Sequence, residues 1–242
     1  MLEGRKILIT NVTHFAGVAA TRHMVDQGAT VLCHDESFTD EEARQTFSGE
    51  TGAVALSAQE PAAIVEEAIA AAGHVDVLIN NDAFPAIRAK IEDADAKDMR
   101  EGLEAMVTRP FIMSGAIVPH FKQRQAGKII FLTSATAFIG LPNYSMYVAA
   151  RAATNGLAIS LAKELARDNI QVNAIAPNFV ENPDYFPPEL LADEAAYAKI
   201  TKNIPLGRLG KPHEISAVIA FYASDQSDFI TGNVLPFAGG WA

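Results

Sequence analysis

Short, almost wholly apolar runs alternate along the chain with longer segments that carry apolar residues at helical spacing. The short runs have the length of strands and are apolar throughout, which is typical of parallel strands covered on both faces. Seven such runs are expected, at 6–10, 30–35, 53–57, 75–81, 128–134, 170–177 and 233–239. Together with the helical segments between them, they predict an α/β fold: a doubly wound parallel sheet of about seven strands with helices on both faces.

The chain is expected to form a single domain over 1–242. Its length suits one doubly wound core, and no repeat, low-complexity tract or linker divides it. The segment 181–197 stands apart because its three prolines favour an irregular loop with a short helix. Ligands of such sheets bind at the carboxyl ends of the strands, and we expect this segment to cover the active site there.

Composition and charge exclude several classes of function. A net charge of −10 argues against nucleic acid or an anionic membrane surface as a partner. No apolar run reaches the length of a membrane span, and no leader-like segment opens the sequence. The single cysteine, Cys33, forms no intrachain disulfide, so a cytoplasmic protein is predicted. The six histidines lack metal-ligand spacing, and no metal site is expected.

The candidate catalytic residues are Ser134, Tyr147 and Arg151. Ser134 ends one apolar run, and Tyr147 opens the next helical segment with Arg151 four positions later, on the same helix face. Arginine stays charged and favours the phenolate form of a neighbouring tyrosine, which is a general base, while Ser134 can hold a substrate oxygen beside it. An ordinary helix-surface pair and a strand-ending serine would show the same spacing.

Motifs along nearly the whole chain are similar to those of the short-chain dehydrogenase/reductase superfamily. They are a strand–turn–helix at the start, N-N-D-A at 80–83, Ser134, the Y-x-x-x-R of Tyr147 and Arg151, and the tail 205–240. The resemblance implies a Rossmann-like fold and a homotetramer.

Five features on the path of that superfamily's nicotinamide cofactor depart from its pattern. They are Asn11 and Phe15 in the glycine-rich turn, Asn178 after Pro177, Asn182 for a threonine, Met106 for the asparagine of the catalytic tetrad, and Arg151 for the lysine. Glycines in the turn let the backbone approach a pyrophosphate, and Gly17 keeps the helix-packing role of the last one. Asp35 resembles the ribose-binding acid, although a helix cap would look the same.

This combination resembles the halohydrin dehalogenases, a cofactor-independent branch of the superfamily. The similar stretches are T-N-V-T-H-F at 10–15, P-N-F-V at 177–180, and Pro183, Asp184, Tyr185 and Phe186 after them. The resemblance implies a Ser134–Tyr147–Arg151 triad and no cofactor. It also implies a halide pocket in place of NAD(P)H, formed by Phe15, Pro177, Asn178, Phe179, Val180 and Tyr185.

The implied reaction converts a vicinal haloalcohol into an epoxide, a halide ion and a proton, and its reverse opens epoxides with small anions. Backbone N–H groups of the 177–182 turn are expected to form a nest for the halide. Trp241 is expected either to cover a pocket or to close a subunit contact. Two alternatives stay open: an NAD(P)-dependent reductase with an atypical turn, and an inactive relative that binds an anion or a small alcohol.

Overall fold

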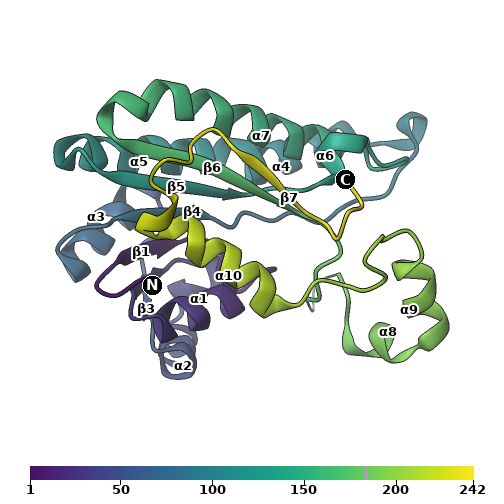
Figure 1. The fold of residues 1–242 in the computed structure, drawn as a ribbon, viewed down its shortest axis with the longest axis horizontal. Helices are drawn as coiled ribbons and strands as arrows, with labels where there is room; N and C mark the ends of the chain where they lie inside the picture. The colour runs from purple at the N-terminus through teal and green to yellow at the C-terminus, as the bar shows by residue number, and fades with distance from the viewer. Residues whose placement is uncertain (183–184) are drawn as a thin grey trace.

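The structure, a computed structural model, describes residues 1–182 and 185–242. Seven parallel strands form one sheet in the order β3-β2-β1-β4-β5-β6-β7 (Figure 1). The strands are β1 (Lys6–Ile9), β2 (Thr30–Cys33), β3 (Val54–Ala55), β4 (Val77–Asn80), β5 (Gly127–Leu132), β6 (Ile170–Pro177) and β7 (Val234–Phe237). The predicted doubly wound α/β fold is therefore confirmed.

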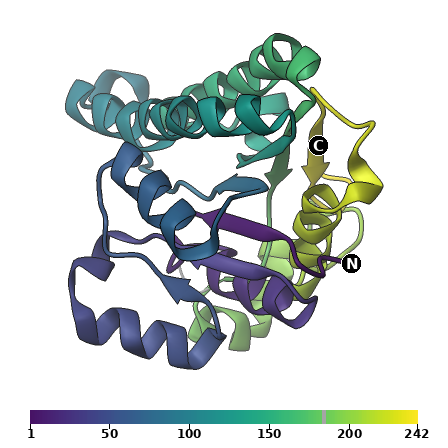
Figure 2. The ribbon, with the colours of Figure 1, turned by 90° about the vertical axis from the view of Figure 1, so that its left-hand side faces the viewer.

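Helices cover both faces of this sheet. They are α1 (Gly17–Asp26), α2 (Glu41–Thr51), α3 (Pro61–Ala72), α4 (Ala96–Leu103), α5 (Arg109–Arg124), α6 (Thr136–Ile139), α7 (Ser145–Leu165), α8 (Pro188–Ala192), α9 (Glu194–Thr201) and α10 (Pro212–Ala223). Short 3-10 helices are η1 (Glu36–Thr39), η2 (Ile91–Asp93), η4 (Ala166–Asp168) and η5 (Asp225–Ser227), and a π-helix, η3 (Glu104–Thr108), joins α4 to α5. Figures 1 and 2 show α5 and α7 on one side of the sheet and α1 and α10 on the other.

Alternate residues of each strand enter two separate cores. In β1, Ile7 and Ile9 pack in the cluster that holds the buried residues of α1 and α10. Leu8 points the other way, into the cluster formed with α3, α5 and α7. Since successive side chains of a strand face opposite sides, a strand buried on both faces must be apolar throughout, as the sequence is.

The order of the strands determines where a ligand-binding crevice can form. β1 lies between β2 and β4, so the chain crosses to the other half of the sheet after β3. Crossovers diverge at this switch point and leave a crevice outside the carboxyl ends of the central strands. Polar residues follow those ends directly: Asn81 and Asp82 after β4, and Thr133 and Ser134 after β5.

The proline-containing segment 181–197 forms more helix than expected. It contains α8 and the first part of α9, which continues to Thr201, and both lie to one side of the sheet (Figure 1). Pro183 and Asp184 lie outside the described residues. Among the described residues, no helix has the length and apolar character needed to cross a membrane.

Candidate active site

One cavity of about 270 Å³ lies at the carboxyl ends of the central strands. All nine residues predicted for the triad and the halide pocket line it: Phe15, Ser134, Tyr147, Arg151, Pro177, Asn178, Phe179, Val180 and Tyr185. The remaining lining residues are Asn81, Asp82, Ala83, Ala86, Leu132, Thr133, Thr136, Leu141, Tyr144, Asn182 and Phe186. Of the segment 181–197, the described residues that line the cavity therefore all precede α8.

Ser134 follows β5 and is buried, with 3% of its surface exposed. Its hydroxyl oxygen accepts a hydrogen bond from the Thr136 N–H at 3.3 Å and lies 2.9 Å from the Thr136 hydroxyl. If Thr136 donates in that pair, the Ser134 proton is left to bond a ligand oxygen in the cavity.

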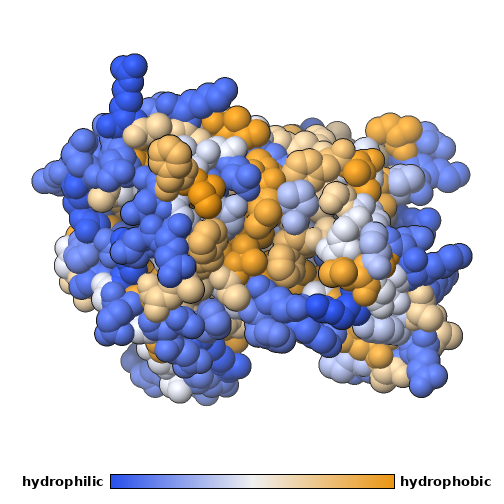
Figure 3. Space-filling view, viewed as in Figure 1, coloured by the Kyte–Doolittle hydropathy of each residue, from blue (hydrophilic) through white to orange (hydrophobic). Residues whose placement is uncertain are grey.

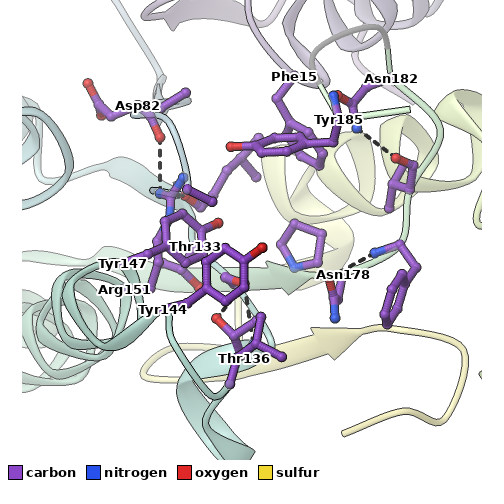
Figure 4. Close-up of a pocket in the computed structure, with 18 of the residues that line it drawn as sticks. Phe15, Asp82, Thr133, Thr136, Tyr144, Tyr147, Arg151, Asn178, Asn182 and Tyr185 are labelled. Carbon is purple, nitrogen blue, oxygen red and sulfur yellow. Dashed lines mark hydrogen bonds between the residues drawn. The ribbon is translucent and has the colours of Figure 1, made fainter. Parts of the chain in front are cut away.

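Tyr147 and Arg151 lie on one face of α7, as their spacing predicts. The Arg151 guanidinium carbon lies 5.3 Å from the centroid of the Tyr147 ring (Figure 4). Arg151 is 5% exposed, and its Nη1 donates to the backbone oxygens of Asp82 and Leu132, both at 3.0 Å. These two bonds fix a permanent positive charge beside the phenol.

Asp82 adds a second buried charge-bearing group to the site. Its side chain accepts a hydrogen bond from Asn11 Nδ2 at 2.7 Å. Burial raises the pKa of Asp82 to about 7, against the opposing effect of Arg151 and Arg109. The carboxyl therefore titrates near neutrality, and no described residue bonds its Oδ2.

The first turn keeps the backbone of a glycine turn without its glycines. Asn11 and Phe15 have φ values of +49° and +46°, in the left-handed region that glycine adopts most readily. Gly17 retains its packing role, since a Cβ atom there would lie 2.3 Å from the Val12 carbonyl oxygen. The turn thus carries an aromatic side chain that lines the cavity where the superfamily pattern has no side chain.

Asp35, after β2, is committed to the protein's own groups. Its carboxylate accepts four hydrogen bonds, from the N–H and hydroxyl of Thr13 and of Ser37, at 2.7–3.1 Å. Burial opposes ionisation, but these bonds outweigh it and lower the pKa of Asp35. The residue caps η1. With Phe15 lining the cavity and Asp35 saturated, the residues present do not fit a bound dinucleotide.

The 177–182 turn differs from the expected anion nest. The N–H of Asn178 donates to Phe237 O, that of Phe179 to the Asn178 side chain, and that of Glu181 to Gly210 O. These three donors have acceptors within the protein, so the expected nest is limited to the N–H groups that remain. Among the described residues, no acceptor is found for the N–H groups of Val180 and Asn182, and the Val180 donor lies beside an apolar wall.

Side chains on both sides hold this turn in place. Phe179 has a left-handed φ of +55° and packs edge-on against Trp241, with ring centroids 5.4 Å apart. Asn182 is buried, donates to Val180 O at 2.7 Å and accepts from the Tyr185 N–H at 3.0 Å. Trp241 therefore supports the cavity wall from behind, and Asn182 connects the turn to Tyr185.

Metal ligation has no visible basis in the described part of the chain. No three of its His, Cys, Asp and Glu side chains gather in a way that would hold an ion.

Met106, aligned with a tetrad asparagine, is buried within η3, and its carbonyl oxygen accepts a hydrogen bond from the Thr154 hydroxyl at 2.7 Å.

Three side chains of the site were not predicted from the sequence: Thr136, Tyr144 and Asp82, whose carboxyl is buried. For Tyr144 a signal was available, because it is a second tyrosine, three residues before Tyr147, at the start of the same helical segment. For Asp82 the signal was a carboxylate in N-N-D-A where the superfamily pattern has alanine. Thr136 gave no comparable signal.

Comparison with known proteins agrees with this geometry. A family model described as enoyl-(acyl carrier protein) reductase matches residues 16–242. A 3-oxoacyl-[acyl-carrier-protein] reductase of Thermotoga maritima is 33% identical over 99% of this chain and 98% of its own. The chain belongs to the short-chain dehydrogenase/reductase superfamily.

Two solved structures narrow the position within that superfamily. A dehalogenation enzyme is 54% identical with a TM-score of 0.97, and the match covers 100% of both chains. A halohydrin dehalogenase, bound to ethyl (2S)-oxiran-2-ylacetate, is 37% identical with a TM-score of 0.93 over 97% of this chain and 96% of that one. The chain lies in the halohydrin dehalogenase branch.

Proposed function

We propose that the protein is a cofactor-independent carbon–halogen lyase, a halohydrin dehalogenase that converts vicinal haloalcohols into epoxides. The observation that carries this function is one cavity lined by Ser134, Tyr147 and Arg151 at one side and by Phe15 and the 177–180 turn at the other. The similarity to a dehalogenation enzyme and a halohydrin dehalogenase supports the same reaction.

In the proposed mechanism, Ser134 and Tyr147 hydrogen-bond the hydroxyl of the haloalcohol. Tyr147, as phenolate favoured by Arg151, takes the hydroxyl proton. The oxygen attacks the adjacent carbon from the side opposite the halogen, the new C–O bond closes the epoxide, and the carbon–halogen electron pair leaves with the halide. Because the reaction is intramolecular, the enzyme's main contribution is to hold oxygen and halogen in line.

The leaving halide is proposed to rest against Phe15, Pro177, Phe179 and Val180. Chloride and bromide are large anions, so an apolar wall with the Val180 N–H as donor suits them without a lysine. Asn178 and Tyr185 complete the proposed pocket. In the reverse direction, the same pocket would admit small anions that open an epoxide.

The test is halide release from 1,3-dichloro-2-propanol by the pure protein without nicotinamide. Native protein is expected to release chloride, and Tyr147→Phe is expected to lose activity by about 100- to 10,000-fold, the usual contribution of a general base. Release that depends on added NADH or NADPH would contradict the proposal.

An NAD(P)-dependent reductase is the second candidate, favoured by the reductase family model and the Thermotoga relative. The Phe15 side chain and the four hydrogen bonds at Asp35 oppose it. Calorimetric titration with NADH decides between them, and micromolar binding to native protein would favour the reductase.

We also propose a homotetramer in the cytoplasm. Phe111 and Ile112 of α5 and Ile159 of α7 are exposed on one side of the sheet, and Phe229 is fully exposed before β7. Figure 3 shows further apolar side chains over the middle of the face where β7 forms the sheet edge. Such patches usually mark contacts between proteins. Light scattering is expected to give four times the mass of the 25.9 kDa chain.

A further inference from the structure

The cavity has a wall that the proposed mechanism does not use. Ser134, Tyr147 and Arg151 occupy one side, and Phe15 with the 177–180 turn occupies another. The rest of the lining includes Thr136, Leu141, Tyr144 and Phe186. If the proposed function holds, the carbinol oxygen and the halogen take the first two sides. The arm on the carbinol carbon then faces this third wall.

Tyr144 brings a phenol to this wall beside the proposed base. It is the residue directly before α7 and lies three positions ahead of Tyr147. Figure 4 shows the two tyrosine rings next to each other at the cavity. An arm on a carbinol held at Tyr147 is therefore within reach of the Tyr144 side chain.

The hydrogen bonds of Tyr144 among the described residues come from its backbone. Its N–H donates to Leu141 O at 3.2 Å, and its carbonyl oxygen accepts from the Val148 N–H at 2.9 Å. The neighbouring hydroxyl on this wall, that of Thr136, is paired with Ser134 at 2.9 Å. The Tyr144 phenol thus remains to serve a ligand, and Leu141 and Phe186 add apolar side chains to the cavity lining.

We infer that Tyr144 is a specificity-determining residue that donates a hydrogen bond to an acceptor atom on the substrate's arm. The favoured substrates are vicinal haloalcohols whose arm carries an uncharged ether, ester or nitrile acceptor near the carbinol carbon. A phenol is a good donor to such groups, and an arm without an acceptor forms no such hydrogen bond.

The experiment uses two substrates that differ by one atom. 1-Chloro-3-methoxypropan-2-ol has an ether oxygen where 1-chloropentan-2-ol has a methylene group. The kcat/KM for chloride release is measured on both with native protein and with Tyr144→Phe. The ratio of ether to alkyl substrate is expected to fall about two- to tenfold in the variant, chiefly through a higher KM for the ether, as expected for one neutral hydrogen bond. Comparing the two ratios cancels the different hydration of the substrates.

The matched control is Tyr197→Phe, which removes a phenol on α9 away from the cavity lining and is expected to keep the native ratio. Melting curves of both variants check their folding. Binding of unreactive 1-methoxypropan-2-ol and pentan-2-ol to native and Tyr144→Phe protein gives an independent comparison. An unchanged ratio in Tyr144→Phe overturns the inference while dehalogenation stands. A native protein that releases chloride from neither substrate overturns the proposed function instead.

Discussion

The guanidinium of Arg151 lies over the ring of Tyr147, with its central carbon 5.3 Å from the ring centroid. Two backbone carbonyls, those of Asp82 and Leu132, hold it there. The position of the charge is therefore set by β5 and by the segment after β4, in addition to the helix that carries both residues.

Arg151→Lys should retain more activity than Arg151→Met. Lysine keeps the positive charge beside the phenol, whereas methionine removes it and leaves the two carbonyls without their donor. We expect kcat to fall by about tenfold in the lysine variant and by at least about 100-fold in the methionine variant. Chloride release at saturating substrate measures both, and equal losses would contradict the role given to the charge.

Asp82→Asn should change how stability depends on pH. The pKa of this carboxyl is about 7 when folded and about 3.8 in its ordinary state. The folded protein therefore binds the proton more tightly, and the stability contributed by Asp82 falls as the pH rises through that window. The difference corresponds to about 4 kcal/mol at most.

We expect the melting temperature of Asp82→Asn to rise relative to that of the native protein as the pH increases from about 4 to 7. Above about pH 8 the difference between the two melting temperatures is expected to stay constant. Asparagine can still accept the hydrogen bond from Asn11. The exposed Asp26→Asn serves as control and should run parallel to native. Parallel curves for Asp82→Asn would contradict the raised pKa.

Phe15→Gly should weaken halide binding. The substitution removes an apolar wall of the proposed pocket, while the left-handed backbone at this position suits glycine. The inhibition constant of bromide is expected to rise about tenfold, a typical effect of losing part of a buried apolar contact. Phe15→Leu keeps an apolar wall and should fall between native and glycine. Unchanged bromide inhibition in the glycine variant would place the halide elsewhere.

Cys33 should resist thiol reagents in the folded protein. It is fully buried in β2, and burial raises the pKa of its thiol to about 12. Thiolate is the reactive form, so labelling is expected to need unfolding. A chromogenic disulfide reagent should report less than a tenth of one thiol per chain in buffer and one thiol in denaturant. Full labelling in buffer would show that the strand opens readily.

The seven strands were predictable because burial on both faces makes each run apolar along its length. β3 is the shortest, two residues paired with Leu32 and Cys33, where the sequence predicts five. β3 lies at the edge of the sheet, where it pairs with a strand on one side only, and Val54 is exposed there. The apolar run in the sequence is therefore longer than the stretch that pairs.

The part of the site that is formed by side chains was predictable from the sequence. The spacing along the chain indicated Ser134, Tyr147 and Arg151. Phe15 was indicated because it stands at a position where glycine is expected. The expected anion nest has fewer N–H donors in the structure because backbone N–H groups look alike in a sequence: the donors of Asn178 and Glu181 are taken by Phe237 and Gly210. Those acceptors lie tens of residues further along the chain, and no local sequence pattern predicts these backbone hydrogen bonds.

The parallel bridge between Val180 and Gly210 has a consequence for how this protein can change. It connects the proposed halide end of the cavity to the segment just before α10, while Leu141 and Tyr144 come from the segment before α7. If the proposed function holds, mutations before α7 are expected to change which carbon skeletons are accepted with little effect on the choice of leaving group. Natural variation and laboratory evolution would then have two separate segments of the chain at which to change substrate preference.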